Sequence, residues 1–449
     1  MIGVSRTAGF LTGLLAPALL AGAAWAAASI QTLTSPGGKD YWLVEEASIP
    51  MVAMEISFVG GASTEPDGKL GASNFLAAML DEGAGDMESL AFSTRAELLA
   101  ANFSFSAGQD AFSVSARMLS ENLDESAVLL RTAIAEPRFD EEPMRRVRGQ
   151  IVSSLRSAET DPNALASRAW FGAAFPDHPY GRPGDGTIET VSALDADDLR
   201  AAHRRLLTRE GAVIGIVGDV TPEKAGEMVD MLLAGLPEAA PERPAMVEPD
   251  PAGAVSVVDF DAPQTTVMFG HAGPLRDDPD FIPAYVMNYI LGGGGFSSRL
   301  TVEVREKRGL AYSTYSYIAS LDRAGLILGG VGTANARAAE SLDVIRAEWR
   351  RMAEEGVTAE ELDKARRYLT GAYPLRFDSN GKIAGILVAM QRDGLPADYV
   401  TTRNALVEAV TPEDVSRVAR KWLDADALRV VAVGRPEGLG EAVEPAAIQ

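Results

Sequence analysis

The sequence predicts an α+β protein with two homologous domains, each an antiparallel sheet covered by helices, that face each other across a cleft. Three observations support this prediction. The chain has 449 residues, which is too many for one hydrophobic core. The same order of strand-like and helix-like segments occurs twice. Between the two occurrences lies a segment rich in Pro, Ala and Glu, residues 237–254, which is typical of an extended linker.

The first repeat follows an apolar leader. Alternating patterns predict its strands and helical spacing predicts its helices. In chain order these are a strand at 51–61, helices at 71–82 and 90–101, strands at 103–108 and 111–119, and a helical stretch from 122 to about 175. Pro137 and Pro162 break this last stretch into separate helices.

The second repeat shows the same order of elements. It consists of a strand at 265–273, helices at 281–293 and 297–309, strands at 311–321 and 324–333, and helices at 336–356 and 358–375. Hairpins followed by helix pairs are typical of α+β layers, in which helices cover one face of an antiparallel sheet.

Composition excludes several classes of function. The formal net charge is −22, which argues against nucleic acid or an anionic membrane as the partner. Such a charge serves ordinary solubility, and a basic peptide partner is the alternative that stays open. The chain contains no cysteine, so disulfides, thiolate zinc sites and cysteine nucleophiles are excluded.

Residues 1–28 predict a secretory signal peptide. A single charge, Arg6, precedes an apolar stretch that ends in small residues, and Ala24-Trp25-Ala26 fits an A-x-A cleavage site. No later run is long and apolar enough to span a membrane, so we expect a periplasmic protein without stable membrane insertion. An uncleaved leader that acts as an anchor is the alternative.

Three ordered segments resemble one family. They are EISFVGGASTEPDGKLGASNFLAAML (55–80), the segment HPYGRPG…IVGDV (178–220), and LGGGGFSSRLTVEVREKRGLAYSTYSY (291–317). Together they resemble the insulinase or pitrilysin family of zinc peptidases, the M16 type, over about residues 33–435. The resemblance implies an N-terminal-like domain at 29–236 and a C-terminal-like domain at 255–449, on either side of the linker.

The resemblance also identifies a metal site that has lost its ligands. In this family a helix carries His-x-x-Glu-His, whose two histidines bind zinc and whose glutamate acts as the base. The matching positions here are Asn74, Ala77 and Ala78, and the third ligand falls near Leu155. No carboxylate occurs from residue 143 to 158. We therefore expect no metal and no other cofactor in this chain.

Other metal and nucleotide sites find no support in the sequence. His178, His203 and His271 are the only histidines, and none has another histidine three or four residues away. The run Gly292, Gly293, Gly294 and Gly295 lacks the Lys-Ser/Thr of a phosphate loop. The resemblance implies instead that this loop borders the path of a peptide substrate.

Two residues of the second repeat match substrate-binding residues of the family. The family places an Arg and a Tyr seven residues apart, reaching toward the substrate at the zinc, and here these are Arg305 and Tyr312. A guanidinium and a phenol can both donate hydrogen bonds to a peptide carbonyl or a developing oxyanion. The pattern is also that of an ordinary charged helix face, with Glu303 and Lys307 as i,i+4 partners.

These features predict the catalytically incomplete subunit of a heterodimeric zinc metallopeptidase. A zinc-binding M16 homologue would supply the metal, this chain would supply Arg305 and Tyr312, and a peptide would be the substrate. Activity of the chain alone is not expected. A non-catalytic peptide-binding or scaffold protein of the same fold is the main alternative, and a zinc peptidase with relocated ligands is the third.

Overall fold

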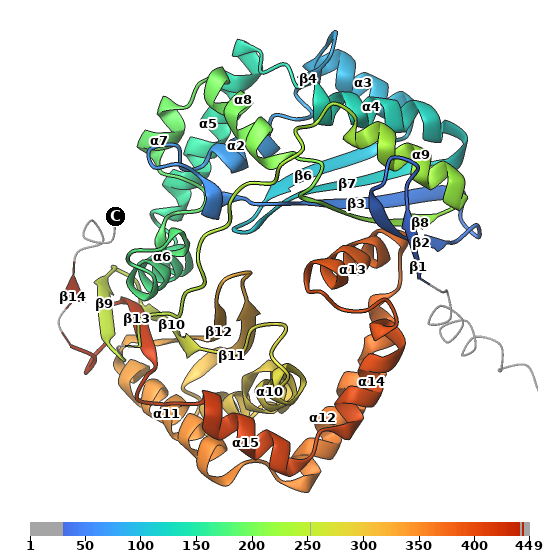
Figure 1. Cartoon of the computed structure of the whole chain (residues 1–449). Helices are drawn as coiled ribbons and strands as arrows, with labels where there is room; N and C mark the ends of the chain where they lie inside the picture. Colours follow the sequence, from blue (N-terminus) through green and yellow to red (C-terminus); the bar gives the residue numbers. More distant parts are fainter. Residues whose placement is uncertain (1–29, 252, 441, 444–449) are drawn as a thin grey trace, which may run out of the picture.

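The computed structural model describes residues 30–251, 253–440 and 442–443. The predicted signal peptide lies outside these residues. Two six-stranded sheets, one in each half of the chain, carry helices as shown in Figure 1. Within the described part of the chain, no helix is both long enough and apolar enough to cross a membrane.

The first sheet has the strand order β1-β2-β8-β3-β7-β6. Its strands are β1 (Gln31–Thr34), β2 (Asp40–Glu45), β3 (Met51–Val59), β6 (Asn102–Ala107), β7 (Ala111–Leu119) and β8 (Ala212–Gly218). β2 and β8 run parallel and the other neighbours run antiparallel. A two-stranded ribbon, β4 (Gly83–Ala84) and β5 (Met87–Glu88), stands apart from it.

The second sheet has the order β11-β12-β10-β13-β9-β14. Its strands are β9 (Val255–Asp259), β10 (Gln264–Ala272), β11 (Ala311–Ser320), β12 (Gly325–Ala334), β13 (Arg429–Gly434) and β14 (Ala442–Val443). β9 runs parallel to both β13 and β14, and the remaining pairs are antiparallel.

The two sheets share one topology. The five strands β2-β8-β3-β7-β6 of the first sheet correspond in order to β9-β13-β10-β12-β11 of the second. In both, the first and last strands of the repeat form the parallel pair, because the helices between them return the chain to the same end of the sheet. The predicted α+β class and the repeat are confirmed, and each sheet is mostly rather than wholly antiparallel.

Helices cover these sheets, and α2 to α6 and α10 to α12 follow the predicted order, whereas α7 to α9 and α13 to α15 were not predicted. Those of the first half are α2 (Ala72–Ala77), α3 (Ser89–Leu98), α4 (Leu123–Ala135), α5 (Glu141–Ala158), α6 (Pro162–Ala174), α7 (Ile188–Ala193), α8 (Ala196–Leu206) and α9 (Pro222–Leu233). Those of the second are α10 (Phe281–Asn288), α11 (Ala338–Glu355), α12 (Ala359–Ala372), α13 (Asn380–Arg392), α14 (Tyr399–Ala409) and α15 (Pro412–Trp422). Residues 237–251, within the predicted linker, contain neither helix nor strand.

Two of the predicted helices of the second repeat contain π-helical segments. The helix predicted at 281–293 continues from α10 into the π-helical segment η5 (Tyr289–Gly293). The helix predicted at 297–309 consists mainly of a second π-helical segment, η7 (Thr301–Glu306). π-helical turns are rare and are frequent at functional sites.

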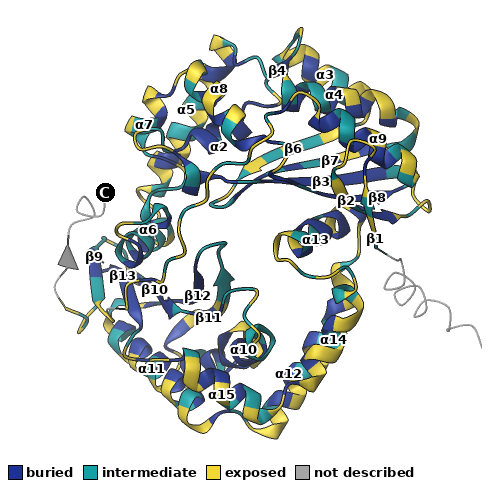
Figure 2. Cartoon of the chain, viewed as in Figure 1, coloured by how far each residue is buried: buried dark blue, intermediate teal, exposed yellow. Residues whose placement is uncertain are grey.

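Each half contributes one helix to the sheet of the other half. α6 packs on β10 and β13 of the second sheet, and α13 packs on β3 and β8 of the first (Figure 1). Trp170 of α6 is fully buried there and donates a hydrogen bond from Nε1 to the Arg429 carbonyl at 3.2 Å. Leu387 of α13 lies in an apolar cluster with Val44 and Val217. In Figure 2 these two helices are buried on the sides that meet the sheets, whereas the outer faces of α12 and α14 are exposed.

A polar network joins the β6–β7 turn to the β11–β12 turn. The Asp110 carboxylate accepts hydrogen bonds from the Tyr180 hydroxyl at 2.9 Å and from the Asp322 N–H at 3.0 Å. The Arg323 N–H in turn donates to the Tyr180 hydroxyl at 2.9 Å. Burial raises the pKa of Asp110. Burial and the neighbouring carboxylate raise the pKa of Tyr180, so its hydroxyl keeps the proton that it donates.

Candidate functional site

Helix α2 carries the positions that match the zinc motif. Gly71 directly precedes it, and its φ of 86° is in the left-handed region where glycine is favoured. The buried Glu65 carboxylate accepts hydrogen bonds from the Gly71 N–H at 2.8 Å and the Ser73 N–H at 2.6 Å. These bonds satisfy two donors that a helix N-terminus leaves free. α2 is thus held firmly by the buried Glu65.

The geometry of a two-histidine site is retained in α2, although its residues are not. The Ala78 N–H donates to the Asn74 carbonyl at 3.1 Å, so these two side chains lie one turn apart on the same face, and both are half-buried. Ala77 is buried in the apolar core that also contains Leu155 of α5. Methyl, isobutyl and carboxamide groups do not form a zinc ligand set, so these four positions do not fit the metal.

The three histidines have structural surroundings. The His271 Nε2 accepts a hydrogen bond from Trp349 at 2.9 Å, the His203 Nε2 contacts the Ile134 carbonyl at 2.6 Å, and the His178 Nδ1 accepts from the Tyr180 N–H at 3.2 Å. Burial lowers the pKa of all three. In the described ranges, no group of three or more His, Cys, Asp or Glu residues could hold a metal ion. Relocated zinc ligands therefore find no support there.

Arg305 and Tyr312 lie together in the second half. The Arg305 guanidinium is 5.1 Å from the centre of the Tyr312 ring and 4.9 Å from that of Phe296. The Tyr312 side chain is 81% exposed and Phe296 is 71% exposed. Among the described residues, neither the guanidinium nor the Tyr312 hydroxyl has a hydrogen-bond or ion-pair partner in the chain. Their donors are therefore available to a ligand.

The charged helix face that the sequence offered as an alternative is present, but it does not include Arg305. The buried Glu303 carboxylate binds Lys307 at 2.7 Å and Arg308 at 2.6 Å. These two cations hold the pKa of Glu303 below its usual value against the effect of burial, which is the largest single influence on that pKa and raises it. Arg305, on the π-helical segment η7, points instead to the two aromatic rings.

A β-bulge determines where Tyr312 points. Ala311 pairs with Thr333 and Ser313 with Gly332, so Tyr312 is an extra residue in the edge strand β11. Consecutive residues of a regular strand face opposite sides of the sheet, yet Tyr312 and Ser313 are both exposed. Bulges redirect side chains in this way and are frequent next to active sites.

The glycine loop packs directly on this strand. A Cβ atom at Gly292 would overlap the Ser316 side chain, which explains the need for glycine there. Gly293 and Gly294 also lie close to neighbouring atoms, and Gly295 has a φ of +56°. The loop leads into Phe296 and so brings its ring to Arg305. The structure therefore brings the glycine loop, Arg305 and Tyr312 together, whereas Asn74 and Ala77 lie on α2 in the other half and Ala78 directly follows that helix.

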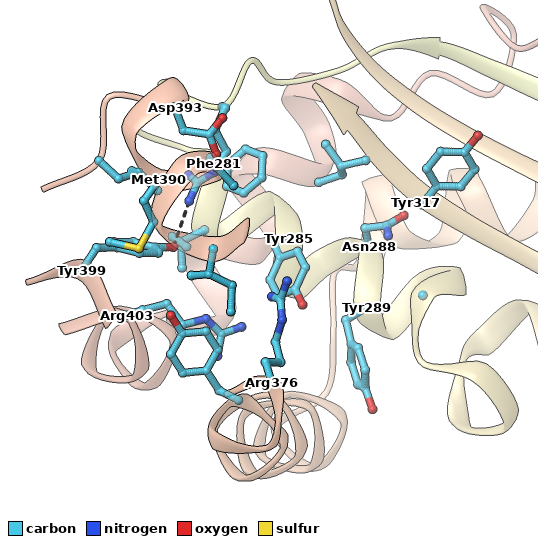
Figure 3. Close-up of a pocket in the computed structure, with 18 of the residues that line it drawn as sticks. Phe281, Tyr285, Asn288, Tyr289, Tyr317, Arg376, Met390, Asp393, Tyr399 and Arg403 are labelled. Carbon is cyan, nitrogen blue, oxygen red and sulfur yellow. Dashed lines mark hydrogen bonds and ion pairs between the residues drawn. The ribbon is translucent and has the colours of Figure 1, made fainter. Parts of the chain in front are cut away.

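Two features of this half were not found from the sequence. Phe296 was missed, although a large apolar residue after four glycines is a recognisable signal for an exposed contact. The second feature is a cavity of about 440 Å³ that begins beside Gly293 and β11. Figure 3 shows tyrosines and arginines of its lining, which come from α10 and η5 (Tyr285, Tyr289), β11 (Tyr317), η9 (Tyr373–Arg376) and α14 (Tyr399, Arg403).

Comparisons with known proteins place these features in context. Residues 42–187 match the family described as insulinase (peptidase family M16), and residues 193–369 match the peptidase M16 inactive domain. The chain is 26% identical over 373 residues to the non-peptidase homolog YmxG of Helicobacter pylori, covering 83% of this chain and 86% of that protein. It is 28% identical over 406 residues to an uncharacterized zinc protease of Streptomyces coelicolor, covering 88% of this chain and 87% of that protein.

A solved structure has the same fold. The crystal structure of a peptidase M16 inactive domain from Pseudomonas fluorescens aligns with a TM-score of 0.86 and 28% identity, covering 92% of this chain and all of that one.

Proposed function

This chain belongs to peptidase family M16, and from this premise we propose that it is the catalytically incomplete subunit of a heterodimeric periplasmic zinc peptidase. One observation carries the proposal. The zinc-motif positions hold no ligand, while the half-buried Arg305 and the exposed Tyr312 are adjacent and without polar partners in the described chain. A zinc-binding M16 homologue would provide the metal and the base.

The role of this chain would be to bind the substrate. The Arg305 guanidinium presents a planar set of donors to a peptide carbonyl or carboxylate. The Tyr312 hydroxyl donates one hydrogen bond to the oxygen that becomes negative during peptide hydrolysis. The two rings that contact Arg305, those of Phe296 and Tyr312, limit the directions in which its guanidinium can point. Such preorganisation lets the donors act without first being ordered.

Reconstitution with a partner tests this proposal. The mature chain is purified alone and together with an M16 homologue from the same genome that contains His-x-x-Glu-His. We expect peptidase activity only from the pair. The double variant Arg305→Ala, Tyr312→Phe should lower kcat by about 10²–10³-fold, the usual effect of removing an oxyanion donor, and leave assembly unchanged in gel filtration.

A matched control uses residues of the same half. Arg420 and Tyr368 are exposed and have no hydrogen-bond or ion-pair partner in the described chain, so Arg420→Ala, Tyr368→Phe should leave kcat unchanged. Hydrolysis by the chain alone, or full activity of the homologue without it, would contradict the proposal.

The second candidate is a non-catalytic peptide-binding or scaffold protein. The edge strand β11 favours it, because Tyr312, Tyr315 and Tyr317 are exposed along a strand to which an extended peptide can add. The relative from Helicobacter pylori that is called a non-peptidase homolog is consistent with it. Under this alternative the double variant of Arg305 and Tyr312 would not change the turnover of any partner peptidase.

The periplasmic location depends on the leader. Export would be tested by osmotic-shock fractionation of cells that express the full chain or a form without residues 1–28. We expect only the full chain in the periplasmic fraction, with a mass that shows removal of the leader. A chain of uncleaved mass in the membrane fraction would instead favour a leader that stays attached and acts as an anchor.

A further inference from the structure

The cavity beside β11 has a charge opposite to that of the chain. Three arginines line it, Arg276, Arg376 and Arg403, and Asp393 is its only acidic residue. The whole chain, in contrast, has a formal net charge of −22. The lining therefore has an excess of two positive charges, which favours the binding of an anion.

Arg403 is buried and, among the described residues, has no carboxylate partner. Only 6% of its surface is exposed. Its Nη1 donates to the Leu369 carbonyl at 2.7 Å and to the Asn404 side chain at 3.0 Å, both of which are neutral. Its guanidinium lies 4.5 Å from the centre of the Tyr373 ring. A buried cation without a counter-charge is unfavourable, so an anion in the cavity would stabilise it.

The other two arginines differ in their partners. Arg276 pairs with Asp393 at 3.2 Å, lies 4.2 Å from the centre of the Phe281 ring and donates to the Tyr399 hydroxyl at 3.1 Å. Arg376 is exposed at the cavity and, within the described residues, has no hydrogen bond or ion pair. Figure 3 shows it extending from η9 toward Tyr285. Arg376 is therefore free to bind an incoming anion.

The walls of the cavity are aromatic. Six rings line it, those of Phe281, Tyr285, Tyr289, Tyr317, Tyr373 and Tyr399. Such walls accept an aromatic or large apolar group, and the phenols can also donate hydrogen bonds. A volume of about 440 Å³ is enough for one large side chain and its backbone.

The cavity also opens onto the edge strand. Ser316, Tyr317 and Ile318 of β11 and Gly293 of the glycine loop form part of its lining. An extended peptide that lies along β11 would therefore have a residue at the cavity.

We propose that this cavity binds a carboxylate of a peptide together with an adjacent aromatic or large apolar side chain. Arg376 and Arg403 would bind the carboxylate and the tyrosines would surround the apolar group. The carboxylate belongs either to the free C-terminus of a peptide or to an internal Asp or Glu. This site goes beyond the proposed peptidase role and requires no partner subunit, so its test does not depend on that role.

Isothermal titration of the mature chain tests the proposal with unlabelled hexapeptides. The first peptide is Gly-Ser-Ala-Gly-Ala-Phe with a free C-terminus, and the second is the same peptide with an amidated C-terminus. The third is amidated Gly-Ser-Ala-Glu-Phe-Ala. We expect saturable binding of the first or third peptide and at least about tenfold weaker binding of the second, since charge-assisted hydrogen bonds are the strong ones. If only the first peptide binds, the recognised carboxylate is the free C-terminus. If only the third peptide binds, it is an internal carboxylate.

Variants then locate the binding to this cavity. Arg376→Gln should weaken the carboxylate peptide about tenfold and Arg376→Glu more strongly, and neither change disturbs a contact that stabilises the fold. Arg420→Gln, at an exposed arginine away from the cavity, should leave binding unchanged. Binding of the second peptide as tight as that of the first or third, no binding of any peptide, or unchanged affinity of Arg376→Glu would overturn the proposal.

Discussion

Replacing Tyr180 by Phe tests the network that joins the two halves of the chain. The ring is fully buried, so the substitution removes one hydroxyl and keeps the packing. That hydroxyl donates to Asp110 at 2.9 Å and accepts from the Arg323 N–H at 2.9 Å. Asp110 keeps two other donors, the Ser63 hydroxyl and the Asp322 N–H, both at 3.0 Å.

The expected loss of stability follows from these two bonds. A hydrogen bond to a charged group contributes about 1.5–3 kcal/mol, and a buried N–H left without a partner costs about 1–3 kcal/mol. Because Asp110 retains two donors, we expect the lower part of the combined range, about 3 kcal/mol. For a domain of roughly 200 residues, this corresponds to a decrease in Tm of about 6–12 °C.

Differential scanning calorimetry measures this decrease. Tyr368→Phe is the matched control, because Tyr368 is exposed and its hydroxyl has no hydrogen-bond partner in the described chain. We expect the control to unfold at the temperature of the wild type. If Tyr180→Phe lowers the Tm no more than the control does, the two turns are not held together by this network.

Three further predictions concern other parts of the structure. Burial raises the pKa of Asp110, so the folded state binds its proton more tightly than the unfolded state, and this contribution to stability is lost as the pH rises through the folded pKa. The stability advantage of the wild type over Asp110→Asn, from urea unfolding, should therefore shrink as the pH rises above about 4, the ordinary pKa of an aspartate. Leu387→Ala should destabilise the fold by about 2.7–5 kcal/mol and speed amide hydrogen exchange in β8 of the opposite half. Faster hydrogen exchange in the second sheet alone would contradict the packing of α13 on the first sheet. A four-residue variant should bind about one zinc ion by metal analysis where the wild type binds none, and no bound zinc would show that α2 lacks the geometry of a metal helix. Its substitutions are Asn74→His, Ala77→Glu, Ala78→His and Leu155→Glu.

Local patterns were sufficient to predict the repeat, whereas Arg305 and Tyr312 were identified only through the resemblance to the family. Strand alternation and helical spacing are local, so most segments from 51 to 175 and from 265 to 375 were placed correctly. The exceptions are the helix predicted at 71–82, which ends at Ala77, and the helix predicted at 297–309, which is mainly π-helical. The sequence does not show which sheet a helix covers. α6 and α13 each follow the helices of their own half, yet each buries its apolar face on the other half, and only the folded chain reveals this.

The cavity shows a second limit of reading a sequence. Net charge is a sum over all residues, and it suggested basic peptides as the partner to consider. A binding site depends only on the residues that the fold brings to one place. Arg276, Arg376 and Arg403 are up to 127 residues apart along the chain (403 − 276), and the fold gathers them around a single acidic residue. The local charge is therefore the reverse of the global one.

Several irregular features of the structure lie close to Arg305 and Tyr312. The repeats share one topology, but the π-helical segments, the bulge at Tyr312 and the exposed Phe296 all lie in the second repeat. π-Helical turns, a bulge and an Arg305 that has no polar partner among the described residues do not help a sheet to pack, so a scaffold gains nothing from them. A site that binds ligand needs such features, because they hold free donors at the surface. The double variant of Arg305 and Tyr312 therefore separates the two candidate functions. It should lower the turnover of the reconstituted pair if the chain is a peptidase subunit and leave it unchanged if the chain is a scaffold.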